Sequence, residues 1–516
     1  MKVNQVKFGS LVSYVQIAAG IVIGLAYTPA MIRLLGQSEY GLYNTASSII
    51  SMLSILSLGF NSGYIRFFSK YKRENDTEKI HSLNGMYLII FTLIGTVALI
   101  CGLILSSHLD IVFDQGLTEG EYQLAYKLMV LLTVNLSISF PMSVFSNIIS
   151  ANEKFILLKL LGLIKTVLSP LVTLPLLLMG FRSVAMVVVT MTITLLVDMV
   201  YVYYVVAVLG NKFCFRNFES RIFKELFVYT SFIAINMIVD QVNWNVDKLL
   251  LARYRGTISV AVYSVGYTLF SYYMMFSTAV SGVFTPRVHR IVCSASDEKK
   301  MSGELTALFV KVGRVQFLIL GLIASGLVFY GHAFITNIWA GKDYSESYYV
   351  MILLVLSSFV PLIQNLGIEI QRSQNLHKFR SIVYSIMAGV NLVLSIFLCR
   401  RYGAVGSAIG TAVSLTLCNG VIMNIYYARK CNIGIGLFWI NILGMLKGLP
   451  FPIVAGLLLR TVWSDYTLAA WLFKILIYSL VYCLSMWCFA MNQQEKDLFL
   501  KPLLRVVRRS GKARND

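Results

Sequence analysis

The sequence predicts an all-α membrane protein with about fourteen transmembrane helices, in which two pseudo-symmetric six-helix lobes precede two extra C-terminal helices. Of its 516 residues, 57% are hydrophobic and only 13% are charged. A soluble domain carries about 25% charged residues, so this composition excludes a chain of water-soluble domains. Two further observations support the prediction. Long apolar runs recur along the whole chain, and its basic residues favour alternate connections between them.

Each transmembrane helix requires roughly 20 apolar residues, and fourteen runs approach or exceed that length. The run at 226–250 is the most polar of them, because it carries Asp240, Asp247 and Lys248. The first run follows Lys2 and Lys7 but is too long for a signal peptide, so we interpret it as an uncleaved span. The runs cover residues 10–32, 41–65, 84–106, 124–149, 156–180, 184–209, 226–250, 258–284, 312–335, 348–370, 381–399, 404–428, 437–459 and 467–491.

The distribution of basic residues predicts the orientation. Of 44 Lys and Arg, 31 lie on the side of the N-terminus and 10 on the opposite side, with three inside spans. Because cytoplasmic loops are rich in Lys and Arg, we expect both termini in the cytoplasm of a bacterial inner-membrane protein. The net charge of +20 mostly reflects this asymmetry, so we expect no nucleic-acid partner. The ten residues on the opposite side are Arg33, Lys127, Arg182, Lys248, Arg253, Arg255, Lys342, Arg400, Arg401 and Arg460.

Internal repeats predict the domain organisation. Tyr40–Tyr43 matches Val260–Tyr263, Lys154-Phe155 matches Lys378-Phe379, and Val184–Thr190 matches Val405–Thr411, with offsets of 220, 224 and 221. Leu34-Leu35-Gly36 also matches Leu250-Leu251-Ala252, with four extra residues in the second copy. These offsets correspond to six spans. Because six is an even number, the chain enters the membrane from the same side in both halves. We therefore predict lobes at 1–210 and 211–430, helices 13 and 14 within 431–494, and a basic cytoplasmic tail at 495–516.

The tail has two equally good interpretations. Its apolar residues Leu500, Leu503, Leu504 and Val507 have helical spacing and alternate with seven basic residues. Such a segment can lie on anionic lipid, where each basic residue contributes up to about 1 kcal/mol. Alternatively, the basic residues serve only as a topology anchor.

The seventh run carries the most informative polar residues. Asn236, Asp240, Asn243 and Asp247 are spaced by four, three and four residues, which places them on one helical face with Lys248 beside it. One interpretation is a structural face whose carboxylates pair with basic residues of a neighbouring helix. The other is a cavity lining that contacts sugar hydroxyls or a coupling cation. We favour the second, because such a face would be costly against lipid.

Basic residues in or beside other spans are the second group of candidates. A charged side chain at membrane depth costs a few kcal/mol, so each is a functional candidate, and Arg or Lys suits a diphosphate. Lys165 lies deep in its span, whereas Arg33, Arg66 and Lys447 lie near span ends and can extend to the interface. Asp198 and Glu369 fit ion-pair partners better than proton carriers. The candidates are Arg33, Arg66, Lys165, Lys447 and Lys474.

Three patches carry a resemblance to a known family. They are Leu34–Tyr43 after the first span, Asn245–Leu251 in the seventh, and Tyr402–Ala408 leading into the twelfth. With the length and topology, they resemble the lipid-linked oligosaccharide flippases, the Wzx-like polysaccharide transporters of the multidrug/oligosaccharidyl-lipid/polysaccharide exporter superfamily. The resemblance implies a MATE-like fold with a cavity that opens alternately to each face. It also implies an undecaprenyl-diphosphate-linked oligosaccharide as cargo and a groove for its lipid tail at the last two helices, where Lys447 and Lys474 lie.

Enzymatic motifs are absent from the sequence. No GxxxxGK[ST], HExxH or GxSxG element occurs, and the five His and eight Cys form no metal-ligand spacing. We therefore expect no catalytic residues, no metal site and no cofactor, with Na⁺ or H⁺ left open as a coupling ion. A polymerase of glycan assembly is disfavoured further because no outer loop exceeds about twenty residues.

The sequence therefore favours a flippase that moves the lipid-linked oligosaccharide from the cytoplasmic to the outer leaflet. The alternative is a cation- or proton-coupled drug antiporter of the same superfamily, which would use Asp240 or Asp247 as its ion site. The expected partners are the glycan lipid, membrane lipids and other membrane proteins of polysaccharide assembly. We expect a monomer.

Overall fold

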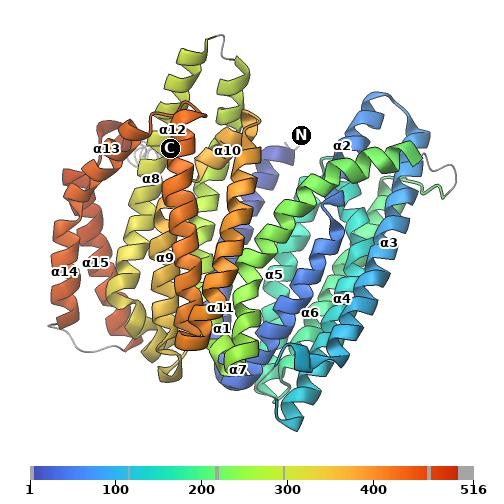
Figure 1. Cartoon of the computed structure of the whole chain (residues 1–516), viewed down its shortest axis with the longest axis horizontal. Coiled ribbons are helices and arrows are strands. Elements are labelled where there is room, and N and C mark those ends of the chain that lie inside the picture. Colours follow the sequence, from blue (N-terminus) through green and yellow to red (C-terminus); the bar gives the residue numbers. More distant parts are fainter. Residues whose placement is uncertain (1–4, 114–116, 216–219, 295–296, 462–466, 498–516) are drawn as a thin grey trace, which may run out of the picture. The chain divides into compact units, whose positions relative to one another are not determined.

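The computed structural model describes residues 5–113, 117–215, 220–294, 297–461 and 467–497. Nearly all of them are helical, as the ribbons in Figure 1 show. The chain forms two compact units. The first contains Met1–Val265 and Ala388–Thr411, and the second contains Gly266–Met387 and Ala412–Asp516. The helices α7 and α11 therefore contribute to both units. The lobes predicted at 1–210 and 211–430 remain a prediction.

The first unit is built from the first six helices and parts of α7 and α11. Their bounds are α1 Gln5–Leu53, α2 Phe60–Arg73, α3 Thr77–Ser107, α4 Glu119–Ala151, α5 Phe155–Leu178, α6 Ser183–Tyr203, α7 Ser220–Ser294 and α11 His377–Leu415. The second unit contains the rest of α7 and α11 with the remaining helices. These are α8 Glu298–Ala333, α9 Ser347–Ile363, α10 Leu366–Ser373, α12 Met423–Arg429, α13 Ile435–Met445, α14 Pro450–Thr461 and α15 Leu468–Phe489.

The helices agree with the predicted membrane spans. Among the described residues, eight helices are long and apolar enough to cross a membrane, or up to ten if each of two bent pairs counts as one span. This count treats α1 and α11 as single helices, although a glycine kink divides each of them, and α7, into two. Thirteen of the fourteen apolar runs coincide with a helical segment on one side of such a kink, or with a separate helix or helix pair. The run at 41–65 instead extends from the second half of α1 into α2. The all-α membrane fold is confirmed, with about fourteen spans.

Apolar side chains cover the outside of these helices. Val22 in α1, Leu93 in α3 and Leu171 in α5 are 65%, 61% and 64% exposed. Large exposed apolar surfaces mark contact with another apolar phase, since a soluble monomer exposes few of them. Inside the first unit, aromatic rings of α2 pack on α3, with Tyr64 and Tyr87 in edge-to-face contact at 4.9 Å. The outer surface therefore suits a lipid environment.

Glycines produce the kinks. Gly36 in α1 has φ 77° and ψ 172°, and Gly256 in α7 has φ 78° and ψ −178°. Only glycine adopts this conformation at no steric cost. The two kinks are 220 residues apart and have almost the same geometry, so Gly36 corresponds to Gly256. The sequence alignment of Leu34-Leu35-Gly36 with Leu250-Leu251-Ala252 was therefore four residues out of register, and the extra residues precede the kink.

Positive φ angles recur elsewhere at nearly the same interval. Glu153 and Asn375 have φ of 59° and 58°, and Gly210 and Asn432 have φ of 62° and 52°. The two residues of each pair are 222 residues apart. Glu153 and Asn375 follow the fourth and tenth predicted spans, and Gly210 and Asn432 follow the sixth and twelfth. The turns thus repeat together with the helices, which is the pattern expected of two pseudo-symmetric lobes.

Gly406 allows the two halves of α11 to pack closely beyond their kink at Gly403. A methyl group at Gly406 would lie 2.0 Å from the carbonyl oxygen of Leu398, whereas one at Gly389 in the same helix would meet nothing within 4 Å. We expect Gly406→Ala to destabilise the protein by about 1–3 kcal/mol, because a backbone atom must move. Gly389→Ala should be neutral or stabilising by up to about 1 kcal/mol. Unfolding midpoints in detergent would measure both, and equal midpoints would refute this close packing.

Candidate functional site

A buried carboxylate lies at the centre of the first unit's polar core. Asp247 of α7 is 1% exposed and accepts three hydrogen bonds from hydroxyl groups. Its Oδ1 accepts from Ser407 Oγ at 2.7 Å, and its Oδ2 accepts from Thr411 Oγ1 at 2.6 Å and from the Tyr263 hydroxyl at 2.9 Å. Asn391 Oδ1 lies 3.3 Å from Thr411 Oγ1 and also accepts from Ser395 Oγ at 3.2 Å. We call these six residues the Asp247 cluster.

The kinks explain how the chain brings the cluster together. Asp247 and Tyr263 lie on opposite sides of the kink at Gly256. Asn391 and Ser395 precede the kink at Gly403, and Ser407 and Thr411 follow it. In each α11 pair the residues are four apart, so both point from the same face of their helical segment. Each kinked helix thus supplies oxygen atoms from both of its halves.

The cluster has an oxygen-rich environment, and the neighbouring Lys248 interacts electrostatically with Asp247. All six side chains are at most 3% exposed. No Lys or Arg forms an ion pair with Asp247 among the residues that the structure describes. A buried charge that is not held in a close ion pair is costly. The arrangement therefore suits a bound proton or a hard cation such as Na⁺, because hard cations prefer carboxylate, amide and hydroxyl oxygen ligands.

The other predicted residues of α7 lie in different environments. Asn243 is 8% exposed, and its Nδ2 has no hydrogen-bond partner among the described residues. Asn236 and Lys248 are half-buried, and Asp240 is exposed. The helical face predicted from spacing is thus buried at the end that carries Asn243 and Asp247. A binding role for these residues stays a prediction.

Lys165 in α5 has one charged neighbour. It is half-buried and interacts electrostatically with Asp198 of α6, although no ion pair within 4 Å joins them. The sequence interpretation of Asp198 as an internal partner for a basic residue agrees with this position. A diphosphate approaching Lys165 would therefore compete with only one, indirectly placed carboxylate.

The remaining predicted basic residues differ in their exposure. Arg33 near the kink of α1 and Arg66 in α2 are exposed, and so is Lys447 in the turn between α13 and α14. Lys474 of α15 is fully buried. Glu369 forms an ion pair with Arg372 one turn away, at 2.8 Å. The last two spans thus place one lysine inside the second unit and one on its surface.

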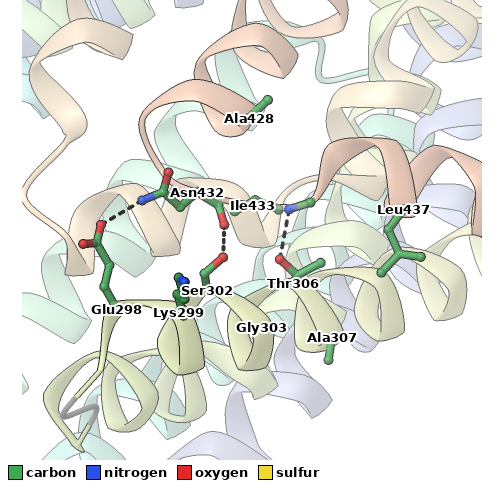
Figure 2. A pocket seen from close by; sticks show the side chains of 11 residues that line it. Glu298, Lys299, Ser302, Gly303, Thr306, Ala307, Ala428, Asn432, Ile433 and Leu437 are labelled. Carbon is green, nitrogen blue, oxygen red and sulfur yellow. Dashed lines mark hydrogen bonds between the residues drawn. The ribbon is translucent and has the colours of Figure 1, made fainter.

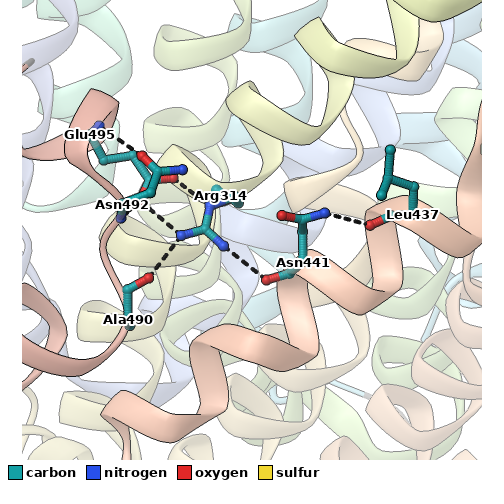
Figure 3. A network of polar contacts seen from close by, with 6 residues as sticks. All are labelled: Arg314, Leu437, Asn441, Ala490, Asn492 and Glu495. Carbon is teal, nitrogen blue, oxygen red and sulfur yellow. Dashed lines mark hydrogen bonds and ion pairs between the residues drawn. The ribbon is translucent and has the colours of Figure 1, made fainter.

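A buried ion pair in the second unit was not predicted from the sequence (Figure 3). Arg314 of α8 pairs with Glu495, and the two side chains are 8% and 2% exposed. Arg314 also donates to the carbonyl oxygens of Asn441 in α13 and Ala490 after α15, at 3.0 and 2.8 Å. Arg314 stands at the start of the run at 312–335, where it was counted with the basic residues of the cytoplasmic side, and Glu495 is the first residue of the predicted tail. The signal that could have suggested this pair is that each residue is a single charge beside an apolar run.

We expect this pair to hold the C-terminal helices against α8. Removing one partner of a buried pair leaves an uncompensated charge, so Glu495→Gln should cost about 3–5 kcal/mol. Breaking the exposed Glu369–Arg372 pair by Glu369→Gln should cost less than about 1 kcal/mol. Thermal unfolding in detergent would compare the two variants. A similar loss in both would show that Arg314 is satisfied by its carbonyl contacts alone.

A pocket of about 670 Å³ opens beside the start of α8 (Figure 2). Its polar edge includes Glu298 and Ser302, which hydrogen-bond to the side chain and carbonyl oxygen of Asn432, respectively. Thr306 accepts a hydrogen bond from the backbone N–H of Gly434 at 2.9 Å. Ala307, Ala428 and Leu437 form its apolar part. Most of the polar groups in Figure 2 thus form hydrogen bonds between α8 and the turn before α13.

Comparison with known proteins identifies the family. Residues 9–292, more than half of the chain, match the model of the polysaccharide biosynthesis protein family. A curated relative is the capsular polysaccharide biosynthesis protein CapF of Staphylococcus aureus, which is 25% identical over 210 residues. That match covers 40% of this chain and 49% of the relative, so it spans about half of the relative's length.

Solved structures share the fold over a longer stretch. The lipid II flippase MurJ in an inward closed conformation has a TM-score of 0.65 and 18% identity, and the match covers 96% of this chain and 99% of that one. An inward-facing multidrug resistance MATE family transporter of the MOP superfamily has a TM-score of 0.54 and 15% identity, with 82% and 99% covered. The predicted MATE-like fold and the predicted relation to polysaccharide assembly proteins are confirmed. The chain belongs to the polysaccharide biosynthesis protein family.

Proposed function

We propose that this protein is a flippase that moves an undecaprenyl-diphosphate-linked oligosaccharide from the cytoplasmic to the outer leaflet by alternating access. The observation that carries the proposal is the match of residues 9–292 to a polysaccharide biosynthesis family in a chain with an exporter fold. A sugar chain assembled on a lipid in the cytoplasm needs a membrane protein to cross the bilayer. The proposed setting is the inner membrane with both termini in the cytoplasm.

The C-terminal helices favour a lipid-linked cargo. The lipid II flippase matches 96% of this chain, whereas the multidrug transporter matches 82%. Residues 431–516, which contain α13 to α15, make up 86 of the 516 residues, a share close to that difference. A small soluble drug needs no surface for a long polyprenyl tail. We propose that α13 to α15 accommodate this tail at the lipid boundary.

The cluster around Asp247 is the proposed coupling site. Its carboxylate is buried and surrounded by hydroxyl and amide oxygens contributed by both halves of α7 and of α11. Binding of Na⁺ or H⁺ there neutralises the charge and changes the preferred packing at the kinks. A ligand shifts a conformational equilibrium only through different affinities for the two states, and a site divided between kinked segments can provide that difference.

The membrane potential supplies a second driving force. With the cell interior negative, outward movement of a head group with charge −2 gains about 4.6 kcal/mol across 100 mV if no compensating charge moves. Lys165 is the proposed contact for the diphosphate during this passage. Such a gain can drive accumulation by more than a thousandfold without ATP.

The test is the pool of lipid-linked sugars in cells that lack this protein. We expect one undecaprenyl-diphosphate oligosaccharide to accumulate on the cytoplasmic face and a surface polysaccharide to disappear. The accumulated lipid would also identify the cargo. The fold shared with the multidrug transporter favours a drug antiporter as the second candidate function. An unchanged lipid pool together with altered tolerance to drugs or dyes would support that candidate instead.

A further inference from the structure

Four arginines on the predicted outer side come from two distant stretches of the chain. They are Arg253, Arg255, Arg400 and Arg401, which are four of the ten basic residues predicted outside the cytoplasm. Membrane insertion disfavours Lys and Arg in short outer loops. Four of them at one place therefore require a reason other than topology. We call these residues the outer arginine cluster.

Contacts within the first unit bring the two stretches together. Arg255 Nη2 donates to the carbonyl oxygens of Arg400 and Arg401 at 2.6 and 2.9 Å, which caps the first half of α11 before its kink. The Arg400 guanidinium lies over the ring of Tyr254, 4.2 Å from its centroid. Arg253, on the other side of Tyr254 in sequence, donates to the carbonyl oxygen of Ile111 at 2.7 Å. The two stretches therefore meet at Tyr254 and at the end of the first half of α11.

The charges of the cluster are not neutralised. None of the four forms an ion pair with a carboxylate in the described ranges, and this includes Asp110, the sequence neighbour of Ile111. Arg255 and Arg253 donate to carbonyl oxygens, which carry only partial negative charge. The guanidinium groups of Arg400 and Arg401 donate no hydrogen bond to a described residue. Arg400 and Arg401 are also exposed.

The chemistry of the cluster matches a lipid phosphate. A guanidinium offers two parallel N–H donors that fit phosphate oxygens, and its charge strengthens each hydrogen bond. The cation–π contact with Tyr254 restrains the Arg400 guanidinium, so less freedom is lost on binding. The four arginines lie just before the kinks at Gly256 and Gly403, which the predicted topology places at the outer membrane surface.

We propose that the outer arginine cluster binds the phosphate or diphosphate head group of a lipid in the outer leaflet, with Arg400 and Arg401 as its direct contacts. Arg255 positions them by capping the first half of α11. Two lipids carry this chemistry, namely an anionic phospholipid and a polyprenyl diphosphate. The second source rests on the proposed function, because it is the delivered cargo. The first does not depend on it.

The experiment uses the full-length protein in phosphatidylcholine nanodiscs. Undecaprenyl diphosphate and phosphatidylglycerol are titrated separately, and bound lipid is measured by native mass spectrometry. Arg400→Gln with Arg401→Gln should weaken binding of at least one of the two lipids about tenfold or more. The matched control, Lys342→Gln with Arg460→Gln, removes two charges from the same predicted side and should change binding less than twofold. The lipid affinity of the Arg400→Lys, Arg401→Lys double variant should fall between those of the two glutamine variants. The reason is that lysine keeps the positive charge but lacks the planar pair of N–H donors.

Each result has a defined meaning. Weaker binding of undecaprenyl diphosphate alone identifies the diphosphate as the ligand, and weaker binding of phosphatidylglycerol identifies the phospholipid. Unchanged binding of both lipids, or an equal loss in the control variant, overturns the proposal. Equal unfolding midpoints of the variants exclude a folding defect. The lipid pool of cells lacking the protein tests the flippase separately, so an unchanged pool with weakened phospholipid binding would refute the function but not the site.

Discussion

Replacing Asp247 by asparagine is expected to abolish ion-dependent transport while the protein still folds. Asparagine has nearly the same shape, and an amide oxygen at the place of Oδ2 still accepts hydrogen bonds from the hydroxyls of Tyr263 and Thr411. Its Nδ2 at the place of Oδ1 can donate to the Ser407 hydroxyl once that hydroxyl turns its own proton away. Asparagine cannot carry the negative charge that binds a cation or a proton. Loss of a buried charged partner costs about 2 kcal/mol or more, so ion affinity should fall at least roughly thirtyfold.

Two measurements check this prediction. In proteoliposomes, transport of the lipid-linked oligosaccharide is compared with and without a Na⁺ gradient and a pH gradient. In cells, the cytoplasmic lipid-linked pool should rise towards that of the deletion strain. Asp110→Asn is the control, because Asp110 is an exposed aspartate of the same unit with no proposed role in ion binding. If Asp247→Asn keeps its full ion dependence, the coupling site lies elsewhere.

Reversing the charge of Lys165 is expected to reduce transport to below about 1% of the wild-type rate without preventing membrane insertion. A carboxylate at this position repels the diphosphate and also faces Asp198. Losing a charged hydrogen bond and adding repulsion together cost about 3 kcal/mol or more, which corresponds to over a hundredfold. Lys159→Glu on the exposed surface of the same helix is the control and should transport normally.

A charge exchange separates the two roles that Lys165 can have. If its task is only to neutralise Asp198, then Lys165→Asp combined with Asp198→Lys should restore transport. If it contacts the diphosphate, the exchange should restore stability but leave transport impaired, because the positive charge now lies on α6. The cellular lipid-linked pool and the unfolding midpoint report these two properties independently. Normal transport by Lys165→Glu would remove Lys165 from the mechanism.

Composition and periodicity were enough to predict the fold class. Apolar runs reveal transmembrane helices because lipid accepts no unsatisfied backbone, so each span must be a continuous apolar helix. The run that carried Asp240, Asp247 and Lys248 was the most polar, and it is helical as predicted. The internal repeat was also visible, except that its first segment was placed four residues out of register. Side-chain similarity cannot locate a kink, whereas the φ angles of Gly36 and Gly256 do so directly.

The sequence alone predicted only part of the candidate site. Spacing along one helix identified Asp247, since residues three and four apart share a face. It could not identify Asn391, Ser395 or Thr411 as its neighbours, because their closeness depends on how the kinked α11 packs against α7. The four-residue spacing of the polar pairs in α11 was the signal that could have suggested them.

Local sequence thus specifies which segments enter the membrane, because transfer into lipid depends on each segment's own composition. The partners of charged side chains follow from contacts between distant segments. Arg314 meets Glu495 across 181 residues, and Arg255 meets the end of the first half of α11 across 145. Burial makes such contacts consequential, since a charge removed from water must find a partner wherever the fold provides one. No pattern along a single helix carries that information.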